Sequence, residues 1–302
     1  DRSTAFDFMR EHDTSPIDLV TRRYPLIAII KPFNTCPQIC VYCQRNWEIE
    51  EVLAKNAMAP KDTLDKAIQW FEEHTSMKEM LITGGDPGLL SCRMMEYILE
   101  RASNIKHIER IRIATRILIT LPQRVTDEWV GLLARFNVPG KREVYVVTHV
   151  QHPYEITPET MEATQRLKKK GLTIYNQEVF TPFNSRRFET VALRRALKLI
   201  GIDPYYTFFP KGKKEAREYL VPVARILQER KEEARLMPGS TRTDEPVFNV
   251  PGLGKNHLRA GQDHEVIMIL ADGSRVIEFH PWEKMLNPIE PFVYHDIPIT
   301  EY

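Results

Sequence analysis

The apolar run Tyr24–Lys31, YPLIAIIK, is followed closely by Cys36-Pro-Gln-Ile-Cys40-Val-Tyr-Cys43. Its β-branched and aliphatic content predicts a buried strand. Three cysteines so close together cannot connect distant segments, which disfavours a secreted disulfide scaffold and indicates a reducing compartment. The stretch therefore predicts a strand that carries a compact group of thiols at its carboxyl end.

The same strand signal recurs between helical patterns along the chain. Six strands are predicted in all, at 24–31, 79–83, 111–115, 143–149, 172–179 and 204–209. Helices are predicted at 64–71 (with Asp62 or Thr63 as N-cap), 93–102, 127–136, 158–170, 187–200 and 214–235. This alternation predicts an α/β fold with a parallel sheet and right-handed crossovers, namely a partial (β/α)6 TIM-like barrel. Reactive groups of such barrels lie at the carboxyl ends of strands, where the cysteines fall.

The rhythm changes beyond residue 240. Residues 264–270 and 274–280 flank Ala271-Asp272-Gly273, which is a typical hairpin signal. We therefore expect a lead-in at 1–22, the barrel at 23–238 and a small β appendage at 239–302.

The composition is that of a soluble globular protein, with 42% hydrophobic and 27% charged residues over 302 residues. A net charge of +1 gives no sign of a nucleic-acid groove or a membrane-binding surface. No run reaches the ~18 apolar residues of a membrane span, and no signal peptide is apparent, so a cytoplasmic location is expected. The start at Asp1 instead of Met suggests a trimmed sequence.

The cysteine spacing points to an iron–sulfur cluster. Three thiolates can bind three irons of a cubane and leave the fourth iron open to another ligand. A structural zinc site would need a fourth ligand. Cys92 is the only other cysteine, and Cys92, His74 or His107 could complete such a site only by chance. A zinc module and a non-enzymatic iron–sulfur module remain alternatives.

The pattern CxxxCxxC, with an aromatic residue before the last cysteine, resembles the signature of the radical S-adenosylmethionine (SAM) superfamily. Ile82-Thr-Gly-Gly-Asp-Pro87 closes the second predicted strand and resembles the turn that receives the SAM amino group in that superfamily. The resemblance implies a [4Fe-4S] cluster on Cys36, Cys40 and Cys43. It also implies SAM at Thr83, Gly84, Gly85 and Asp86.

From about Arg23 to His280 the chain also resembles the lysine 2,3-aminomutase family. The matching pieces are Arg23-Tyr-Pro25, Cys36 to Arg45, Ile111 to Arg116, Leu121-Pro-Gln-Arg124, His152-Pro153, Glu155-Ile-Thr157, Asn176-Gln177, Pro204-Tyr-Tyr206 and Pro251-Gly-Leu-Gly-Lys255. The resemblance implies a partial barrel of the radical SAM type and an isomerase that moves an amino group between Cα and Cβ. An electron donor such as flavodoxin or ferredoxin and a homo-oligomer are further expectations.

The aminomutase resemblance also assigns residues. It implies that Lys255 binds pyridoxal phosphate (PLP) covalently, that Gly252 and Gly254 belong to its loop, and that Arg23 binds the phosphate. Ile27 stands where the family usually has a second arginine, so backbone N–H groups or Arg116 would have to supplement phosphate binding. Arg45 matches the arginine that binds the substrate α-carboxylate, and His152 and Gln177 match positions around SAM.

The side-chain pocket indicates the substrate. In the lysine enzymes two aspartates bind the substrate ammonium, and the matching positions here are Lys211 and Asn249. A lysine beside an ammonium would be strongly unfavourable, whereas a carboxylate gains a charged partner. Glutamate 2,3-aminomutases show the same replacement, which implies conversion of L-glutamate to β-glutamate. The alternatives are a lysine 2,3-aminomutase, a PLP-free radical SAM enzyme, or a Lys211 that only begins a basic surface run.

Overall fold

The computed structural model describes residues 7, 9–49, 51–210, 214–250, 254–261, 263–280 and 290–301. Its main sheet has nine strands in chain order, from β1 to β9. The strands are β1 (Val20–Thr21), β2 (Ile27–Phe33), β3 (Glu79–Gly84), β4 (Arg110–Ala114), β5 (Glu143–Thr148), β6 (Thr173–Val179), β7 (Asp203–Phe208), β8 (Glu245–Val250) and β9 (Gly254–His257). Strands β2 to β8 pair in parallel, and β1 and β9 run antiparallel at the two edges. The sheet is curved but open, as expected for a partial barrel.

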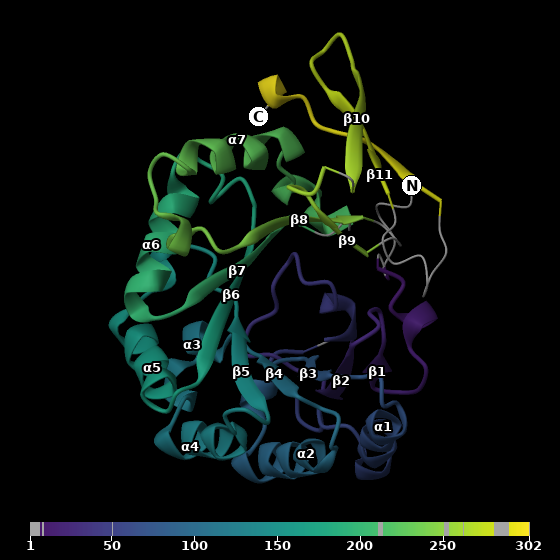
Figure 1. Ribbon diagram of the computed structural model, residues 1–302, viewed down its shortest axis with the longest axis vertical. Helices are drawn as coiled ribbons and strands as arrows, with labels where there is room; N and C mark the ends of the chain where they lie inside the picture. The colour runs from purple at the N-terminus through teal and green to yellow at the C-terminus, as the bar shows by residue number, and fades with distance from the viewer. Residues whose placement is uncertain are drawn as a thin grey trace.

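The helices lie outside this curved sheet (Figure 1). They are α1 (Lys61–Glu73), α2 (Cys92–Asn104), α3 (Ile117–Thr120), α4 (Asp127–Phe136), α5 (Pro158–Lys169), α6 (Glu189–Ile200) and α7 (Val223–Glu233). Alternate strand residues face them, so that Ile30, Ile82 and Ile113 are fully buried in the core that the helices complete. The intervening strand residues face the inside of the barrel.

The six predicted strands are confirmed, and the helix predictions need two corrections. Helix α1 begins at Lys61 with Pro60 as N-cap, so Asp62 and Thr63 lie inside its first turn. The helix predicted over 214–235 is two elements, a 3-10 helix at Lys214–Tyr219 and α7 from Val223. Pro222 is the N-cap of α7 and separates the two elements, because a proline has no N–H with which a preceding helix could continue. Strands β8 and β9 were not predicted and extend the main sheet past residue 238, where the barrel was expected to end.

A second, three-stranded sheet follows. Strand β10 (His264–Ile269) pairs antiparallel with β11 (Arg275–Phe279), which pairs with β12 (Phe292–His295). Gly273 has φ +83° in the connecting turn, so the predicted hairpin is confirmed. The hairpin projects from the barrel (Figure 1), and a second core around Phe279 packs against Phe248.

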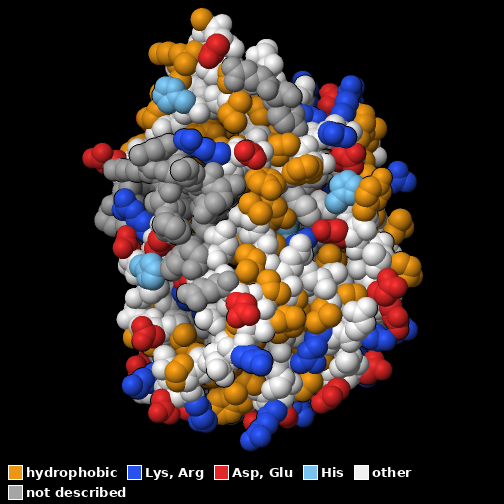
Figure 2. Space-filling view, turned by 180° about the vertical axis from the view of Figure 1, so that it is seen from behind, with side chains coloured by type: hydrophobic (Ala, Val, Ile, Leu, Met, Phe, Trp, Pro, Cys, Tyr) orange, Lys and Arg blue, Asp and Glu red, His pale blue; other side chains and the backbone are white. Residues whose placement is uncertain are grey.

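The outer surface carries both signs of charge. On the face seen from behind, Lys and Arg side chains are interspersed with Asp and Glu over the lower half of the molecule (Figure 2). Among the described helices, none has the length and apolar character that a membrane span requires.

Candidate functional site

A cavity of about 770 Å³ lies inside the curved sheet. Inward-facing residues of the parallel strands line it, together with the N-terminal segment and strand β9. Six residues that the sequence assigned to cofactor or substrate meet in its wall: Arg23, Arg45, Thr83, Gln177, Asn249 and Lys255. Residues from distant parts of the sequence thus face one space.

The cysteine loop follows β2 and lies next to this cavity. Cys36, Cys40 and Cys43 are free, partly exposed thiols. Arg116 Nη1 lies 3.2 Å from Cys40 Sγ, and the Arg45 N–H donates to Cys43 Sγ at 3.4 Å. Burial, followed by the nearby Asp86 carboxylate, raises the pKa of the Cys36 thiol to about 12.

These thiols fit an iron–sulfur cluster. Cationic and N–H donors beside the sulfurs stabilise the negative charge that thiolate ligands and cluster sulfides bring. Within the described residues no three His, Cys, Asp or Glu side chains converge on one metal ion. Cysteines that each bind a different iron of a cubane need not converge in this way.

The turn after β3 requires its glycines. Gly84 has φ +117°, and a Cβ on Gly85 would lie 2.2 Å from the carbonyl oxygen of Thr35. The Gly85 and Asp86 N–H groups donate to Phe33 O at 2.5 Å and Thr35 O at 2.8 Å. The turn is therefore pressed against the start of the cysteine loop, which only glycine permits.

Asp86 ties this turn to the end of β4. Its carboxylate accepts hydrogen bonds from the Thr115 hydroxyl, the Arg116 N–H at 2.8 Å and the Gly88 N–H at 2.9 Å. Burial raises the pKa of Asp86, and these donors oppose the shift. The side chain thus joins the turn after β3 to the loop after β4, and its contact with SAM stays a prediction.

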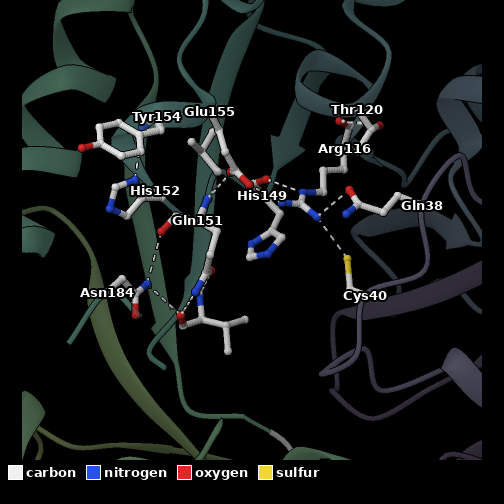
Figure 3. Close-up of polar contacts among 12 residues, drawn as sticks. Gln38, Cys40, Arg116, Thr120, His149, Gln151, His152, Tyr154, Glu155 and Asn184 are labelled. Carbon is white, nitrogen blue, oxygen red and sulfur yellow. Dashed lines mark hydrogen bonds and ion pairs between the residues drawn. The ribbon is translucent and has the colours of Figure 1, made fainter. Parts of the chain in front are cut away.

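Arg116 supports the cysteine loop (Figure 3). It donates to Gln38 Oε1 at 3.2 Å and to His149 O at 3.0 Å, and it pairs with Glu155 at 2.7 Å, besides the contact with Cys40. It is not part of the cavity wall. The supplementary phosphate contact considered for Arg116 stays a prediction.

His149 is a site residue that the sequence reasoning missed. Burial, with Arg116 nearby, lowers its pKa to about 3, so the imidazole is neutral. Nδ1 lies 2.5 Å from Gln177 O, and Nε2 lies 2.9 Å from the hydroxyl of Tyr42. The carbonyl can only accept, so Nδ1 carries the proton and Nε2 accepts from Tyr42. The aromatic residue before the last cysteine was visible in the motif, but nothing local identified its partner.

His152 points elsewhere. Its Nδ1 accepts from the Tyr154 N–H at 3.2 Å, and its Nε2 lies 3.4 Å from Glu189 Oε2. In Figure 3 it lies beside Tyr154, away from Cys40. His152, Gly84, Gly85 and Asp86 are outside the cavity wall, so their proposed contacts with SAM stay predictions.

Lys255 enters the cavity from β9. Its Nζ lies 4.5 Å from the ring centre of Tyr206, 5.2 Å from Tyr24 and 5.7 Å from Phe208. Aromatic faces around an ammonium stabilise it and hold it in place. A lysine presented to a cavity in this way fits an amine that binds an aldehyde cofactor.

Asn249 is paired with Lys255 across β8 and β9. It is buried, its Nδ2 makes a long 3.5 Å contact with Phe209 O, and its Oδ1 has no hydrogen-bond partner among the described residues. A buried polar atom in a cavity wall without a partner fits a residue that binds a ligand. Lys211 and Gly252 lie outside the described residues.

Arg45 is held by carboxylates of the chain. Its Nε and Nη2 each lie 2.9 Å from Glu11 Oε2, and Nε lies 3.8 Å from Glu48 Oε2. Burial works against its charge, but Glu11 and Glu48 outweigh burial and raise the pKa of Arg45. Arg23, which is also buried, donates through Nη1 to the carbonyl of Met9. Sequence reasoning found both arginines but neither partner.

The cavity wall also contains a second charged group, which the sequence reasoning missed. Arg112 donates to the Tyr145 hydroxyl at 2.7 Å and pairs with Glu79 at 2.5 Å. Its guanidinium also lies 5.7 Å from the Tyr205 ring centre. Glu79, Arg112 and Tyr205 thus line the same cavity that Lys255 enters.

Comparison with known proteins agrees with this geometry. The radical SAM superfamily model matches residues 30–192. The chain is 57% identical over its whole length to an uncharacterised KamA family protein of Methanocaldococcus jannaschii, of which it covers 48%. It is 34% identical to glutamate 2,3-aminomutase of Clostridioides difficile (72% of this chain, 50% of that protein). It is 33% identical to L-lysine 2,3-aminomutase of Methanococcus maripaludis (67% and 45%). The chain thus spans about half the length of these relatives.

A solved structure shows the same fold. Streptococcus suis SuiB bound to S-adenosylmethionine superposes with a TM-score of 0.54 at 14% identity, over 75% of this chain and 51% of SuiB. At that identity the likeness concerns the fold alone. The matched family model, the order of the strands and the cysteine loop agree: the chain belongs to the radical SAM superfamily.

Proposed function

We propose that the protein is a PLP-dependent radical SAM 2,3-aminomutase that converts L-glutamate to β-glutamate. The observation that carries this proposal is the shared cavity. Its wall contains the lysine expected for PLP, the arginine expected for the substrate α-carboxylate and residues expected around SAM. Relatives named as glutamate and lysine 2,3-aminomutases support the reaction class.

Each proposed cofactor has candidate binding residues in this chain. Cys36, Cys40 and Cys43 would hold the [4Fe-4S] cluster, Thr83 and Gln177 would contact SAM, and Lys255 with Arg23 would bind PLP. When bound, the reduced cluster and SAM supply a radical that removes hydrogen from Cβ, and PLP carries the amino group while it moves. An electron donor such as flavodoxin or ferredoxin, a cytoplasmic location and a homo-oligomer belong to the same proposal.

The chain's own residues align the reactants. Arg45 would bind the α-carboxylate, which fixes the orientation of Cα and Cβ. The aromatic rings around Lys255 would hold its amine in place in the cavity. Neutral His149, held by Tyr42 and the Gln177 carbonyl, keeps the cysteine loop against β6.

Glutamate is proposed because of the side-chain positions. Sequence identity does not discriminate, since the glutamate and lysine enzymes stand at 34% and 33%. Lys211 would supply a cation for the γ-carboxylate. Asn249 would exchange its long contact with Phe209 O for a hydrogen bond to the same carboxylate.

One observation favours a second candidate, a lysine 2,3-aminomutase. As Asn249 is oriented here, its Nδ2 faces Phe209 O and the atom without a described partner is an acceptor, Oδ1. An acceptor suits the ammonium of lysine better than a carboxylate.

A substrate panel tests the proposal. The protein, reconstituted with iron, sulfide, PLP and SAM and reduced under anaerobic conditions, is incubated with labelled L-glutamate, L-lysine and L-aspartate. Mass spectrometry is expected to find β-glutamate as the main product, and none without PLP. Turnover of lysine alone contradicts glutamate as the substrate. Cleavage of SAM without any β-amino acid contradicts the aminomutase.

A further inference from the structure

The cavity wall contains a carboxylate to which the aminomutase resemblance assigns no role. Glu11 is buried, lines the cavity and lies 2.9 Å from two nitrogens of Arg45 through one oxygen. Its other oxygen accepts from the Gln44 side chain. Glu11 lies outside residues 30–192, the stretch matched by the superfamily model. The arginine expected to bind the substrate carboxylate is thus already bound to one from the chain.

Charge balance shows that Glu11 and a substrate carboxylate compete. Lys31 and Arg45 face Glu11 and Glu48, with Lys31 3.3 Å from Glu48, so two cations balance two anions. A third carboxylate on Arg45 would leave an uncompensated negative charge in a poorly solvated wall, which is strongly unfavourable. Exchange of Glu11 for the substrate carboxylate keeps the balance.

The segment that carries Glu11 forms a compact local turn. The Asp7 carboxylate accepts from the Glu11 and His12 N–H groups at 2.8 and 2.9 Å, which closes a compact turn. Arg10 has φ +51°, a conformation that a residue with a side chain adopts rarely. Beyond the turn the chain is fixed to the barrel, because Arg22 N–H donates to Thr14 O at 2.9 Å. Movement before Thr14 leaves the sheet intact.

The same segment contacts the other anion-binding candidate. The Met9 carbonyl accepts from Arg23 Nη1, and Met9 is buried in the cavity wall. One short stretch therefore supplies oxygens to both arginines that the sequence assigned to anionic groups.

We propose that Glu11 is a resident carboxylate that the substrate α-carboxylate replaces on Arg45, and that residues 9–14 are a strap that this exchange releases. The inference rests on the proposed function only in taking Arg45 as the α-carboxylate site. Every α-amino acid carries that carboxylate, so the exchange does not depend on which side chain the pocket selects.

Hydrogen exchange of the wild-type protein tests the release directly. The protein loaded with cluster and PLP, but without reductant, is compared with and without L-glutamate, L-alanine and L-alaninamide. Both amino acids are expected to speed amide exchange in residues 9–14, and L-alaninamide, which lacks the carboxylate, is expected to leave it unchanged. Unchanged or slower exchange with both amino acids overturns the proposal.

The variant E11Q gives a second test. Gln can keep the contact with Gln44 but loses the charge that competes with substrate, so the Kd for L-alanine, followed by PLP absorbance, is expected to fall about five- to tenfold. E96Q, a Glu-to-Gln change at an exposed ion pair with Arg135, is the matched control and should not alter that Kd. A higher Kd in E11Q would mean that Glu11 positions Arg45 and would overturn the proposal.

The experiments can contradict the aminomutase proposal and the strap proposal independently of each other. If no β-amino acid forms but L-alanine still releases residues 9–14, the aminomutase is wrong and the strap stands. If β-glutamate forms normally while exchange and the Kd of E11Q do not change, only the strap is wrong.

Discussion

Two networks of arginine and carboxylate lie on opposite sides of the sheet. The wall network consists of Lys31, Arg45, Glu11 and Glu48, of which Glu11 and Arg45 line the cavity. The helix-side network lies between α6, α7 and the start of β8 and consists of Arg194, Arg230, Glu233 and Asp244. Each balances two cations with two anions, so charge count does not distinguish them.

The two networks differ in how completely their charged groups are paired and shielded from solvent. Arg194 binds Asp244 through two nitrogens at 2.9 and 2.8 Å, and its side chain is 1% exposed. In the wall network Arg45 is 11% exposed, borders the cavity and has one ion pair as long as 3.8 Å. A closed bidentate network holds elements together, whereas a network open to a cavity can exchange a member for a ligand. The predictions below separate stability from binding on this basis.

The largest effect is expected in the cavity for Lys255→Ala. Loss of the amine should lower product formation by at least about 10³-fold, as removal of a covalent catalytic group does elsewhere. The PLP absorbance band should disappear, while the urea midpoint stays unchanged because Lys255 faces the cavity. Turnover near the wild-type level would remove Lys255 from the mechanism.

On the helix side, Arg194→Met should cost stability. It leaves Glu233 and Asp244 buried with one arginine, and we expect the free energy of unfolding in urea to fall by about 3–5 kcal/mol. Product formation per folded molecule should stay at the wild-type level. A stable variant without activity would mean that this network serves the cavity as well.

Arg45→Gln should weaken binding of the amino acid. Removing one member of a buried charged pair costs about 2 kcal/mol or more in binding, so KM for the amino acid should rise about 30-fold. Arg135→Gln, at an exposed ion pair, is the control and should change KM and stability little. An unchanged KM for Arg45→Gln would exclude Arg45 as the carboxylate site.

The smallest effect concerns Glu178, which lies beside the helix-side network. Burial raises its pKa to about 8, although Arg194 opposes the shift. Between its ordinary pKa and pH 8 the folded protein holds a proton that the unfolded chain has released, so stability falls as pH rises through this window. Relative to Glu178→Gln, the wild type should lose about 1 kcal/mol per pH unit between pH 6 and 8 in urea titrations. Parallel pH profiles would contradict the raised pKa.

The sequence predicted the parts of the fold that local patterns encode. Apolar runs identified the six strands from β2 to β7, and Asp272-Gly273 identified the hairpin. Strand β9, GKNH, has no apolar residue, and β8 contains Pro246 and Asn249, so neither has a strand pattern. Both become strands because β7 and β8 each offer an edge to pair with.

In the candidate site, too, local sequence patterns predict some residues and not others. Cysteine spacing, glycine turns and the lysine after the glycine loop are visible in the sequence. The pairs Tyr42–His149 and Arg45–Glu11 join residues 107 and 34 positions apart, and no local pattern encodes such contacts. Only the arrangement of the strands brings them together.

The open sheet has one more consequence. A closed barrel has a diameter fixed by its strand number and stagger. Strands β1 and β9 are separate edges here, so no such condition fixes the width of this cavity. The distance between these two edge strands can therefore differ between chains that share this fold, without a change in the strand that leads into the cysteine loop.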